Sequence, residues 1–432
     1  MGGTLMAIYL ARAGYRVRVC ERRPDPRAEG ALGGRSINLA LSTRGLHALD
    51  GAGLASAVLG GSVPMRGRMI HSVSGRQTFQ PYGTRKSDAI HSVSRGGLNL
   101  TLLAAAGAED DLSLEFDCRC VDLDPASATL TVENPTTGER RRVESDLVIG
   151  ADGAFSRVRA RLTHLDRFDF SQSYLAHGYK EMTIPAVRPG EFALEPNALH
   201  IWPRGGFMMI ALPNRDGSFT CTLFWPFEGP TGFAAMRDGD DVARFFSRWF
   251  ADAVPLMPDL VGDFARHPVS SLLTVRCRPW FHQGTVALLG DACHAVVPFY
   301  GQGANAAFED CVFLDAALRD HPGDPARAFA VYDAQRREQV NVLADLALRN
   351  FIEMRDRTAS HLFLARKALE RGLHRLAPRL FVPLYSMATF SRRPYGDAVR
   401  RARWQWIWVC VLAGAGLALL AGAMAWALSS GS

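Results

Sequence analysis

The sequence predicts an α/β fold, in which a Rossmann-like parallel sheet is interrupted by an antiparallel β-sheet and followed by C-terminal helices and a single C-terminal transmembrane helix. Three observations predict this fold. Residues 5–21 combine helical apolar spacing, a glycine turn and a strand ending in an acid, as in the later part of a βαβ unit. β-Rich runs separated by turn sequences occupy residues 199–225. Residues 406–428 contain no charged side chain.

The composition excludes several classes of protein. Charged residues make up 21% of the 432 residues and hydrophobic residues 48%, as in ordinary globular proteins. The net charge of +6, from 49 basic and 43 acidic residues, indicates a solvated surface and no nucleic-acid partner. The 12 histidines and eight cysteines lack metal-ligand spacing, because only Cys118 and Cys120 are close together. With no signal peptide at the N-terminus, we expect free thiols and no metal site.

The N-terminal unit lacks its usual beginning. Apolar residues from Leu5 predict a helix that ends at Gly14, and the following strand ends at Glu21. A dinucleotide-binding unit starts with a parallel strand and Gly-x-Gly-x-x-Gly, whose glycines admit a pyrophosphate to a helix N-terminus. Gly3 takes the place of the third glycine. We therefore expect the first strand and the other glycines upstream of Met1, owing to a late start codon rather than a truncation.

Two further strands end in acids, at Asp152 and at Asp291. Taken separately, Asp291 could be a helix cap and the Asp-Gly turn at Asp152 an ordinary strand end. Glu21, Asp152 and Asp291 nevertheless each follow a strand in one chain. Their order favours a nucleotide cofactor bound at the ends of these strands.

The segment after Asp291 favours a flavin. Its loop carries Pro298, Gly301 and Gly303 and leads into a helix that begins near Ala304. Glycines allow close approach to a flat ring, and a helix N-terminus stabilises the negative charge of a reduced flavin. Asp291 can accept hydrogen bonds from ribitol hydroxyls.

The C-terminal run is long enough to cross a bilayer. Its 23 residues would span ~34 Å as a helix. Basic residues precede it, which predicts a tail anchor with the preceding chain in the cytoplasm. The alternative is a buried or partner-binding helix. The predicted interfacial anchors and flanking charges are Trp404, Trp406, Trp408 and Trp426, and Arg400, Arg401 and Arg403.

An arginine and a tyrosine indicate an anionic substrate. Arg68 and Tyr82 flank a β-like stretch, and a buried arginine is costly unless it meets an anion. If Arg68 faces a pocket, a carboxylate is its natural partner; otherwise it is a surface arginine. The sequence contains no Gly-x-Ser-x-Gly elbow, and adjacency of Cys293 and His294 does not make a dyad.

Several segments resemble the kynurenine 3-monooxygenase family of single-component FAD-dependent aromatic hydroxylases. They are GRSINLALSTRGLHAL (34–49), PMRGRMIHSVSG (64–75), PYG (81–83), HSVSR (91–95), DLVIGADGAFSRVR (146–159), HIWPRGGFMMIALPNRDGSFTCTLFWPFE (200–228), GDACHAVVPFYGQGANAAFED (290–310) and NFIEMR (350–355). The resemblance implies a fold like that of p-hydroxybenzoate hydroxylase. It also implies that NADPH reduces FAD, and that O₂ gives a flavin C4a-hydroperoxide that hydroxylates L-kynurenine to 3-hydroxykynurenine.

The resemblance also assigns residues. Pro298, Phe299 and Gln302 would line the catalytic face between flavin and substrate, and Arg68, Tyr82, Asn350 and Tyr385 would bind the substrate. The expected cofactor-binding residues are Gly3, Glu21, Arg22, Arg23, Ala40, Arg95, Cys120, Asp152, Arg157, Asp291, Gly303, Ala304 and Asn305. Glu21 would bind the adenosine ribose, Arg95 the phosphates and Asp291 the ribitol. Some members of this family carry a C-terminal membrane segment.

The expected domain order follows from these motifs. The FAD-binding domain would comprise 1–63, 95–165 and 281–322, the substrate domain 64–94 and 166–280, the helical region 323–400 and the transmembrane helix 404–428. Two alternatives to a kynurenine hydroxylase stay open. One is a flavin hydroxylase of another carboxylated arene. The other is a membrane-anchored, inactive flavoprotein-like scaffold, because the first strand is missing. Apart from the bilayer, expected to be a bacterial inner membrane, we expect no obligate protein partner.

Overall fold

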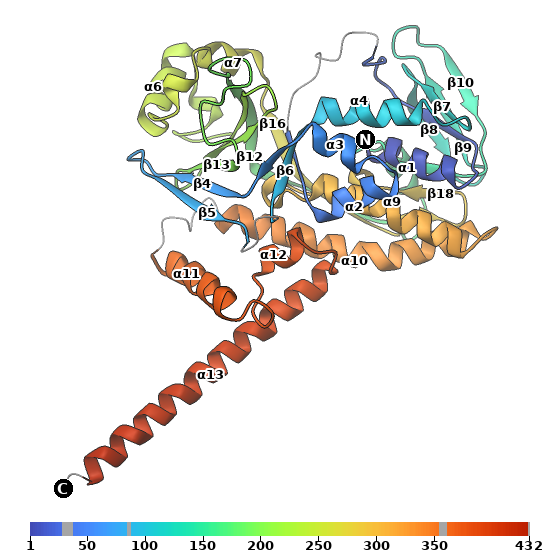
Figure 1. Ribbon diagram of the computed structural model, residues 1–432. Helices are drawn as coiled ribbons and strands as arrows, with labels where there is room; N and C mark the ends of the chain where they lie inside the picture. The colour runs from blue at the N-terminus through green and yellow to red at the C-terminus, as the bar shows by residue number, and fades with distance from the viewer. Residues whose placement is uncertain (28–37, 84–87, 354–360, 431–432) are drawn as a thin grey trace. The chain divides into compact units, whose positions relative to one another are not determined.

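The computed structural model describes residues 1–27, 38–83, 88–353 and 361–430 (Figure 1). The chain divides into two compact units, Met1–Ser360 and His361–Ser432, which are described separately. Parts of two segments quoted for the family resemblance, residues 34–37 and 354–355, lie outside the described residues.

Two short parallel strand pairs form the centre of the first unit. β1 (Val17–Cys20) pairs with β7 (Leu112–Glu115), and β11 (Val148–Gly150) pairs with β18 (Val286–Leu288). β17 (Phe281–His282) adds to β18 in antiparallel orientation. The buried helix α1 (Gly2–Arg12) contacts both α4 (Arg95–Ala106) and α9 (Gly303–Asp320) (Figure 1). Apolar side chains of these helices and strands form one continuous core.

Two small antiparallel sheets flank this centre. In the first, β6 (Ile90–Ser94) lies between β2 (Asn38–Leu41) and β3 (Val63–Met65). In the second, β9 (Thr129–Glu133) lies between β8 (Arg119–Asp124) and β10 (Arg140–Val143). The helices of this part are α2 (Thr43–Gly51), α3 (Ala55–Gly60), α5 (Arg157–Leu162), α8 (Asp291–His294), the 3₁₀ turn η3 (Pro298–Tyr300) and the long α10 (Pro325–Ile352).

The inserted sheet has seven strands and is mixed, which corrects the expectation of a purely antiparallel sheet. Its order is β16-β12-β15-β14-β13-β4-β5, and β4 lies parallel to β13. Trp202, Trp225 and Phe246 fill the core between the sheet and its helices. The strands are β4 (Gly67–His71), β5 (Gln77–Pro81), β12 (Asp169–Ile184), β13 (Ala198–Pro203), β14 (Met208–Pro213), β15 (Phe219–Pro226) and β16 (Ser270–Arg278), and the helices are η1 (Phe233–Ala235), α6 (Gly239–Trp249), η2 (Val254–Leu256) and α7 (Leu260–Arg266).

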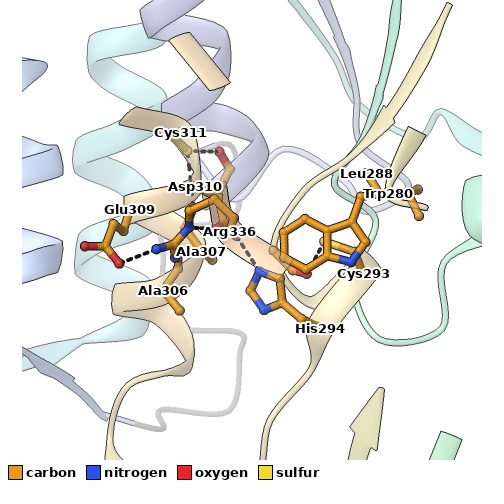
Figure 2. A network of polar contacts seen from close by, with 12 residues as sticks. Trp280, Leu288, Cys293, His294, Ala306, Ala307, Glu309, Asp310, Cys311 and Arg336 are labelled. Carbon is orange, nitrogen blue, oxygen red and sulfur yellow. Dashed lines mark hydrogen bonds and ion pairs between the residues drawn. The ribbon is translucent and has the colours of Figure 1, made fainter. Parts of the chain in front are cut away.

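A buried ionic network joins α9 to α10 (Figure 2). Arg336 of α10 donates from Nε to Asp310 Oδ1 at 2.8 Å and from an Nη to Glu309 Oε2 at 2.7 Å. Arg44 of α2 binds the other oxygen of Glu309 at 2.6 Å, and His294 bonds the other oxygen of Asp310. All five side chains are almost wholly buried. Because each carboxylate meets a cation, the network fixes α9 against α2, α8 and α10.

A second buried polar cluster lies around His71 of β4. His71 contacts Asp252 Oδ2 through Nδ1 at 2.8 Å and His200 Nδ1 through Nε2 at 2.9 Å. Trp202 also donates to Asp252, and Nε2 of His200 faces the carbonyl of Glu195 at 2.9 Å. A carbonyl can only accept, so this nitrogen of His200 carries a proton. The cluster therefore ties β4, β13 and the end of α6 together.

The second unit is helical. α11 (His361–Leu376), α12 (Leu384–Thr389) and α13 (Tyr395–Ser430) are joined by short connections. Gln405 of α13 accepts from the backbone N–H of Val382 at 2.6 Å and donates to its carbonyl at 3.1 Å. An 18-residue stretch within Tyr395–Ala423 has a mean hydropathy of 2.0, and none of its residues is buried. α13 is therefore a long, exposed apolar helix.

The buried network predicts an asymmetry between two neighbouring arginines. Arg336→Met would leave two buried carboxylates short of a cation and lower the free energy of unfolding by ~3–5 kcal/mol. Arg337 is partly exposed and pairs at 3.0 Å with one buried carboxylate, that of Asp333, so Arg337→Met should cost less than Arg336→Met, ~1–3 kcal/mol. Denaturant titration followed by tryptophan fluorescence measures both values. Equal losses in the two variants would contradict the role of the network.

His200 predicts a pH dependence of stability. Burial lowers the pKa of His200 from 6.5 to about 4. The hydrogen bond to the Glu195 carbonyl acts in the opposite direction and is smaller. Between these values the unfolded chain binds a proton that the folded chain excludes, so stability falls as pH falls below about 6.5. At pH 5 the loss from this group would be about 2 kcal/mol relative to pH 7.5. The free energy of unfolding of His200→Gln should fall by about 2 kcal/mol less between pH 7.5 and pH 5, as measured by urea unfolding. If the variant and the original protein lose the same amount, His200 is not the group responsible.

Candidate functional site

The first unit contains a cavity of about 2360 Å³ that runs along the parallel strands β1 and β11. This exceeds the roughly 300–1,000 Å³ of an ordinary ligand pocket. β1 and β11, each an edge strand of its sheet in the described part of the chain, both line it. Nine of the thirteen predicted cofactor residues also line it: Gly3, Glu21, Arg22, Arg23, Arg95, Cys120, Asp152, Arg157 and Asp291.

Gly3 and Glu21 lie at one end of this cavity. A Cβ on Gly3 would stand 3.0 Å from the Cβ of Ala151, so glycine at this position favours the close approach of α1 to the end of β11. Glu21 follows β1 directly, and its carboxylate accepts from the backbone N–H of Arg23 at 3.0 Å. The second carboxylate oxygen of Glu21 has no hydrogen bond that the described structure assigns.

A helix start and three arginines make the cavity suitable for phosphates. Arg95 is the first residue of α4, is exposed and lines the cavity. Ser94 caps this twelve-residue helix by accepting from the N–H of Gly97 at 3.3 Å. Arg22 and Arg23 line the same cavity. The positive end of α4 and these guanidinium groups would stabilise a pyrophosphate.

Asp152 has a structural role in addition to facing the cavity. Its carboxylate accepts from Ser156 Oγ at 2.5 Å and from the N–H groups of Arg157 and Val158 at 2.6 and 3.2 Å. It therefore holds the first turn of α5, a capping role that we considered from the sequence for Asp291 and not for Asp152. The Arg157 side chain itself is exposed on the cavity wall.

Arg159 is a site residue that the sequence reasoning did not select. It is buried, lines the cavity, and donates to the carbonyls of Ala292 at 2.6 Å and Ala154 at 2.7 Å. Arg159 thereby ties the loop after Asp152 to the helix that begins at Asp291. Its position two residues after Arg157, on the buried side of a short helix, was the available signal.

Asp291 lies where the cavity meets β18. Gly290 adopts a positive φ of 64°, and a Cβ there would come within 3.0 Å of Ala307 on α9. The Asp291 side chain is accessible, but the surrounding protein raises the pKa of its carboxyl by desolvation. It makes no hydrogen bond to another described residue. A desolvated acceptor on a cavity wall suits a ligand that brings hydroxyl groups.

The start of α9 brings together a second group of predicted residues. Asn305 is wholly buried, and its Oδ1 accepts from the N–H of Ser42 at 2.8 Å. Its amide donates to the carbonyls of Ala40 at 2.8 Å and Gly301 at 2.9 Å. Ser42 also donates to Gln302 at 3.2 Å. These bonds hold β2 against the N-terminus of α9, where Gly303 and Ala304 remain partly accessible.

The loop between Asp291 and α9 reaches the seven-stranded sheet. Phe299 lies 4.8 Å from Phe224 of β15 and stacks at 4.3 Å on Phe351 (ring centroids). Asn350 of α10 donates to the carbonyl of Phe299 at 2.5 Å. Pro298 is exposed beside it. Asn350 and Phe299, predicted in different roles, are thus direct neighbours.

Arg68 and Tyr82 lie together on the β4–β5 hairpin. The guanidinium of Arg68 stands 5.5 Å from the centre of the Tyr82 ring, which is almost buried. β4 belongs to the same sheet as Phe224. Tyr385 is half-buried on α12 of the second unit and is described with that unit only.

The cysteines form a cluster that C-x-C spacing did not predict. Sγ of Cys20, Sγ of Cys118 and a carboxylate oxygen of Glu115 lie within 4.8 Å of one another, an arrangement of atoms that could hold a metal ion. Arg18 and Arg141 already pair with Glu115. Burial is the main cause that raises the pKa of Cys20 and of Cys120 to about 12, so these groups are neutral thiols.

Comparison with known proteins agrees with this geometry. The family model described as FAD binding domain matches residues 1–345. The fold matches 2-methyl-3-hydroxypyridine-5-carboxylic acid oxygenase with a TM-score of 0.67 at 21% identity, over 90% of this chain and 93% of that one. It also matches HpxO of Klebsiella pneumoniae complexed with FAD and uric acid, with a TM-score of 0.63 at 21% identity over 86% and 90%. The fold is therefore that of the p-hydroxybenzoate hydroxylase-like FAD-dependent monooxygenases.

Closer relatives identify the family. The kynurenine 3-monooxygenase of Salinispora tropica is 50% identical over 406 residues, covering 94% of this chain and 89% of the relative. That of Myxococcus xanthus is 48% identical over 393 residues, covering 91% and 84%. That of Sus scrofa is 43% identical over 405 residues, covering 93% and 85%. The family expected from the sequence motifs is confirmed, and this chain belongs to the kynurenine 3-monooxygenases.

Proposed function

We propose that this chain binds FAD and uses NADPH and O₂ to hydroxylate L-kynurenine to 3-hydroxykynurenine. The observation that carries the proposal is the segment 291–305. The segment begins at Asp291 on the cavity wall, and its Phe299 packs against the seven-stranded sheet. It ends at the N-terminus of α9, which the hydrogen bonds of Asn305 hold in place. A cofactor placed along this segment would meet a substrate held by the sheet.

The described residues fit FAD. The arginines and the start of α4 would hold the pyrophosphate, Glu21 the adenosine ribose, and Asp291 the ribitol. The N-terminus of α9 would stabilise negative charge on the ring. Bound FAD would supply hydride acceptance from NADPH and activation of O₂. Asn305 would act indirectly, because its three hydrogen bonds fix the helix start on which the ring would lie.

The substrate end would depend on charge and exclusion of water. Arg68 would bind the carboxylate of L-kynurenine through its planar guanidinium. The ring of Tyr82 lies against that guanidinium in a cation–π contact. The stacked rings of Phe224, Phe299 and Phe351 would keep water from the reacting carbon. Pro298, Gln302, Asn350 and Tyr385 remain predicted contacts.

α13 would anchor the enzyme. We propose that residues 404–428 cross a membrane and that Arg400, Arg401 and Arg403 keep the preceding chain on the cytoplasmic side. In a bacterium this would be the inner membrane. Retention in the membrane pellet after an alkaline carbonate wash would support this placement, and release would contradict it.

The central experiment measures coupled turnover. Purified protein should carry the visible spectrum of bound flavin, and L-kynurenine should accelerate NADPH oxidation with 3-hydroxykynurenine formed in about equal amount. Anthranilate and 4-hydroxybenzoate are the control substrates for another arene hydroxylase. Faster turnover with a control substrate would replace the proposed substrate. A folded protein that takes up no FAD would instead favour the inactive scaffold.

Substitution of Arg68 separates substrate binding from cofactor binding. Arg68→Ala should raise KM for kynurenine about 10- to 100-fold, the usual size of a lost charge-assisted hydrogen bond, while FAD content stays unchanged. The exposed neighbour Arg66 provides the matched control Arg66→Ala, which should leave KM near its original value. If both variants retain the original KM, the carboxylate role of Arg68 is wrong.

A further inference from the structure

The excess positive charge of the chain lies in its second unit. Residues 361–432 contain ten basic and two acidic residues, a net charge of +8, whereas the whole chain carries +6. Residues 1–360 therefore carry a net charge of −2, with 39 basic and 41 acidic residues. All twelve charged residues of the second unit precede Trp404. The basic part of the second unit, residues 366–403, is thus followed directly by the uncharged apolar part of α13.

Hydrogen bonds hold the segment that contains Arg379 beside residues 401–405 of α13, where the uncharged part of this helix begins. Arg401 donates to the carbonyl of Arg379 at 2.9 Å, and Gln405 bonds both backbone groups of Val382. Residues 379–382 therefore lie beside residues 401–405. α11 reaches the same level, because the guanidinium of Arg366 stands 4.9 Å from the ring centre of Trp406.

Most of these arginines face solvent without a countercharge. Arg366 pairs with Glu370 and Arg400 with Asp397. Five others are exposed and form no ion pair within the described part of the chain: Arg371, Arg375, Arg379, Arg392 and Arg403. Uncompensated cations clustered in this way attract multivalent or densely packed anions.

Exposed apolar side chains accompany the arginines. Leu369, Leu376 and Leu380 expose 49%, 86% and 78% of their surface. Leu376 and Leu380 lie beside Arg375 and Arg379 in the sequence, close to the tryptophans at the start of the uncharged part of α13. Leucine and arginine side chains mixed at one level suit a membrane interface, where the first enters the acyl boundary and the second meets headgroups.

We propose that the second unit binds anionic phospholipid headgroups through Arg371, Arg375, Arg379 and Arg392, with Leu376 and Leu380 inserted at the bilayer surface. This inference rests on the proposed crossing of α13, since that crossing holds the arginines at the headgroup level. Nucleic acid, the other large polyanion, would leave these leucines in water. The occupant is therefore a bilayer surface that contains anionic lipid.

Spin-labelled lipids test this preference on the full chain. The protein is reconstituted into phosphatidylcholine vesicles with trace spin-labelled phosphatidylglycerol or phosphatidylcholine, and the motionally restricted fraction of each label is measured. We expect about fivefold preferential association of phosphatidylglycerol, which corresponds to roughly one arginine contact. The preference should decrease in 0.5 M NaCl, because salt screens exposed charges.

Two quadruple variants make the assignment specific. R371Q/R375Q/R379Q/R392Q should reduce the preference about twofold or more and leave kynurenine turnover in detergent unchanged. The matched control R76Q/R188Q/R215Q/R237Q removes four exposed arginines from the first unit and should keep the preference. Equal restriction of both labels by the original protein would overturn the proposal while leaving the anchor intact. Absence of any restricted lipid, with release by carbonate, would overturn the membrane crossing itself.

Discussion

The two carboxylates of α9 are the constraint on which the rest of the first unit depends. Glu309 and Asp310 are adjacent and buried, and each requires a cation to remain charged. Arg44 of α2 and Arg336 of α10 supply these cations, and His294 of α8 contacts the second oxygen of Asp310. Burial would raise the pKa of Asp310, but the charges and hydrogen bonds of His294 and Arg336 outweigh it and lower that pKa. The network thereby fixes the direction of α9, whose first turn Asn305 then attaches to β2.

This arrangement explains how residues 291–305 can contact both the cofactor cavity and the seven-stranded sheet that would hold the substrate. Asp291 lies on the cavity wall and Phe299 packs on the seven-stranded sheet, only eight positions along the chain. Asn350 binds the same loop from α10, the helix that also carries Arg336. A shift of α10 would therefore act on the loop and on α9 together. Rigid placement of this kind is what positions a cofactor ring against its substrate.

The sequence predicted those parts of the site that follow from strand ends and local pairing. Glu21, Asp152 and Asp291 line one cavity because the carboxyl ends of parallel strands meet at one edge. Arg68 and Tyr82 meet because a hairpin places them together. The parallel pairing of β4 with β13 was not predictable, since about 130 residues separate the strands. Arg336 and Arg159 were missed for the same reason: periodicity does not reveal which distant carbonyl or carboxylate a buried arginine meets.

Asp291 is the acceptor on which the proposed binding of the cofactor depends most directly. Titration of the FAD-free protein with FAD, followed by flavin fluorescence, gives the dissociation constant for the original chain, for Asp291→Ala and for the exposed control Asp240→Ala. We expect Asp291→Ala to weaken FAD binding about 10- to 100-fold, as for a lost hydrogen bond to a charged group, without a change in the unfolding midpoint. Equal affinities of the three proteins would contradict this role.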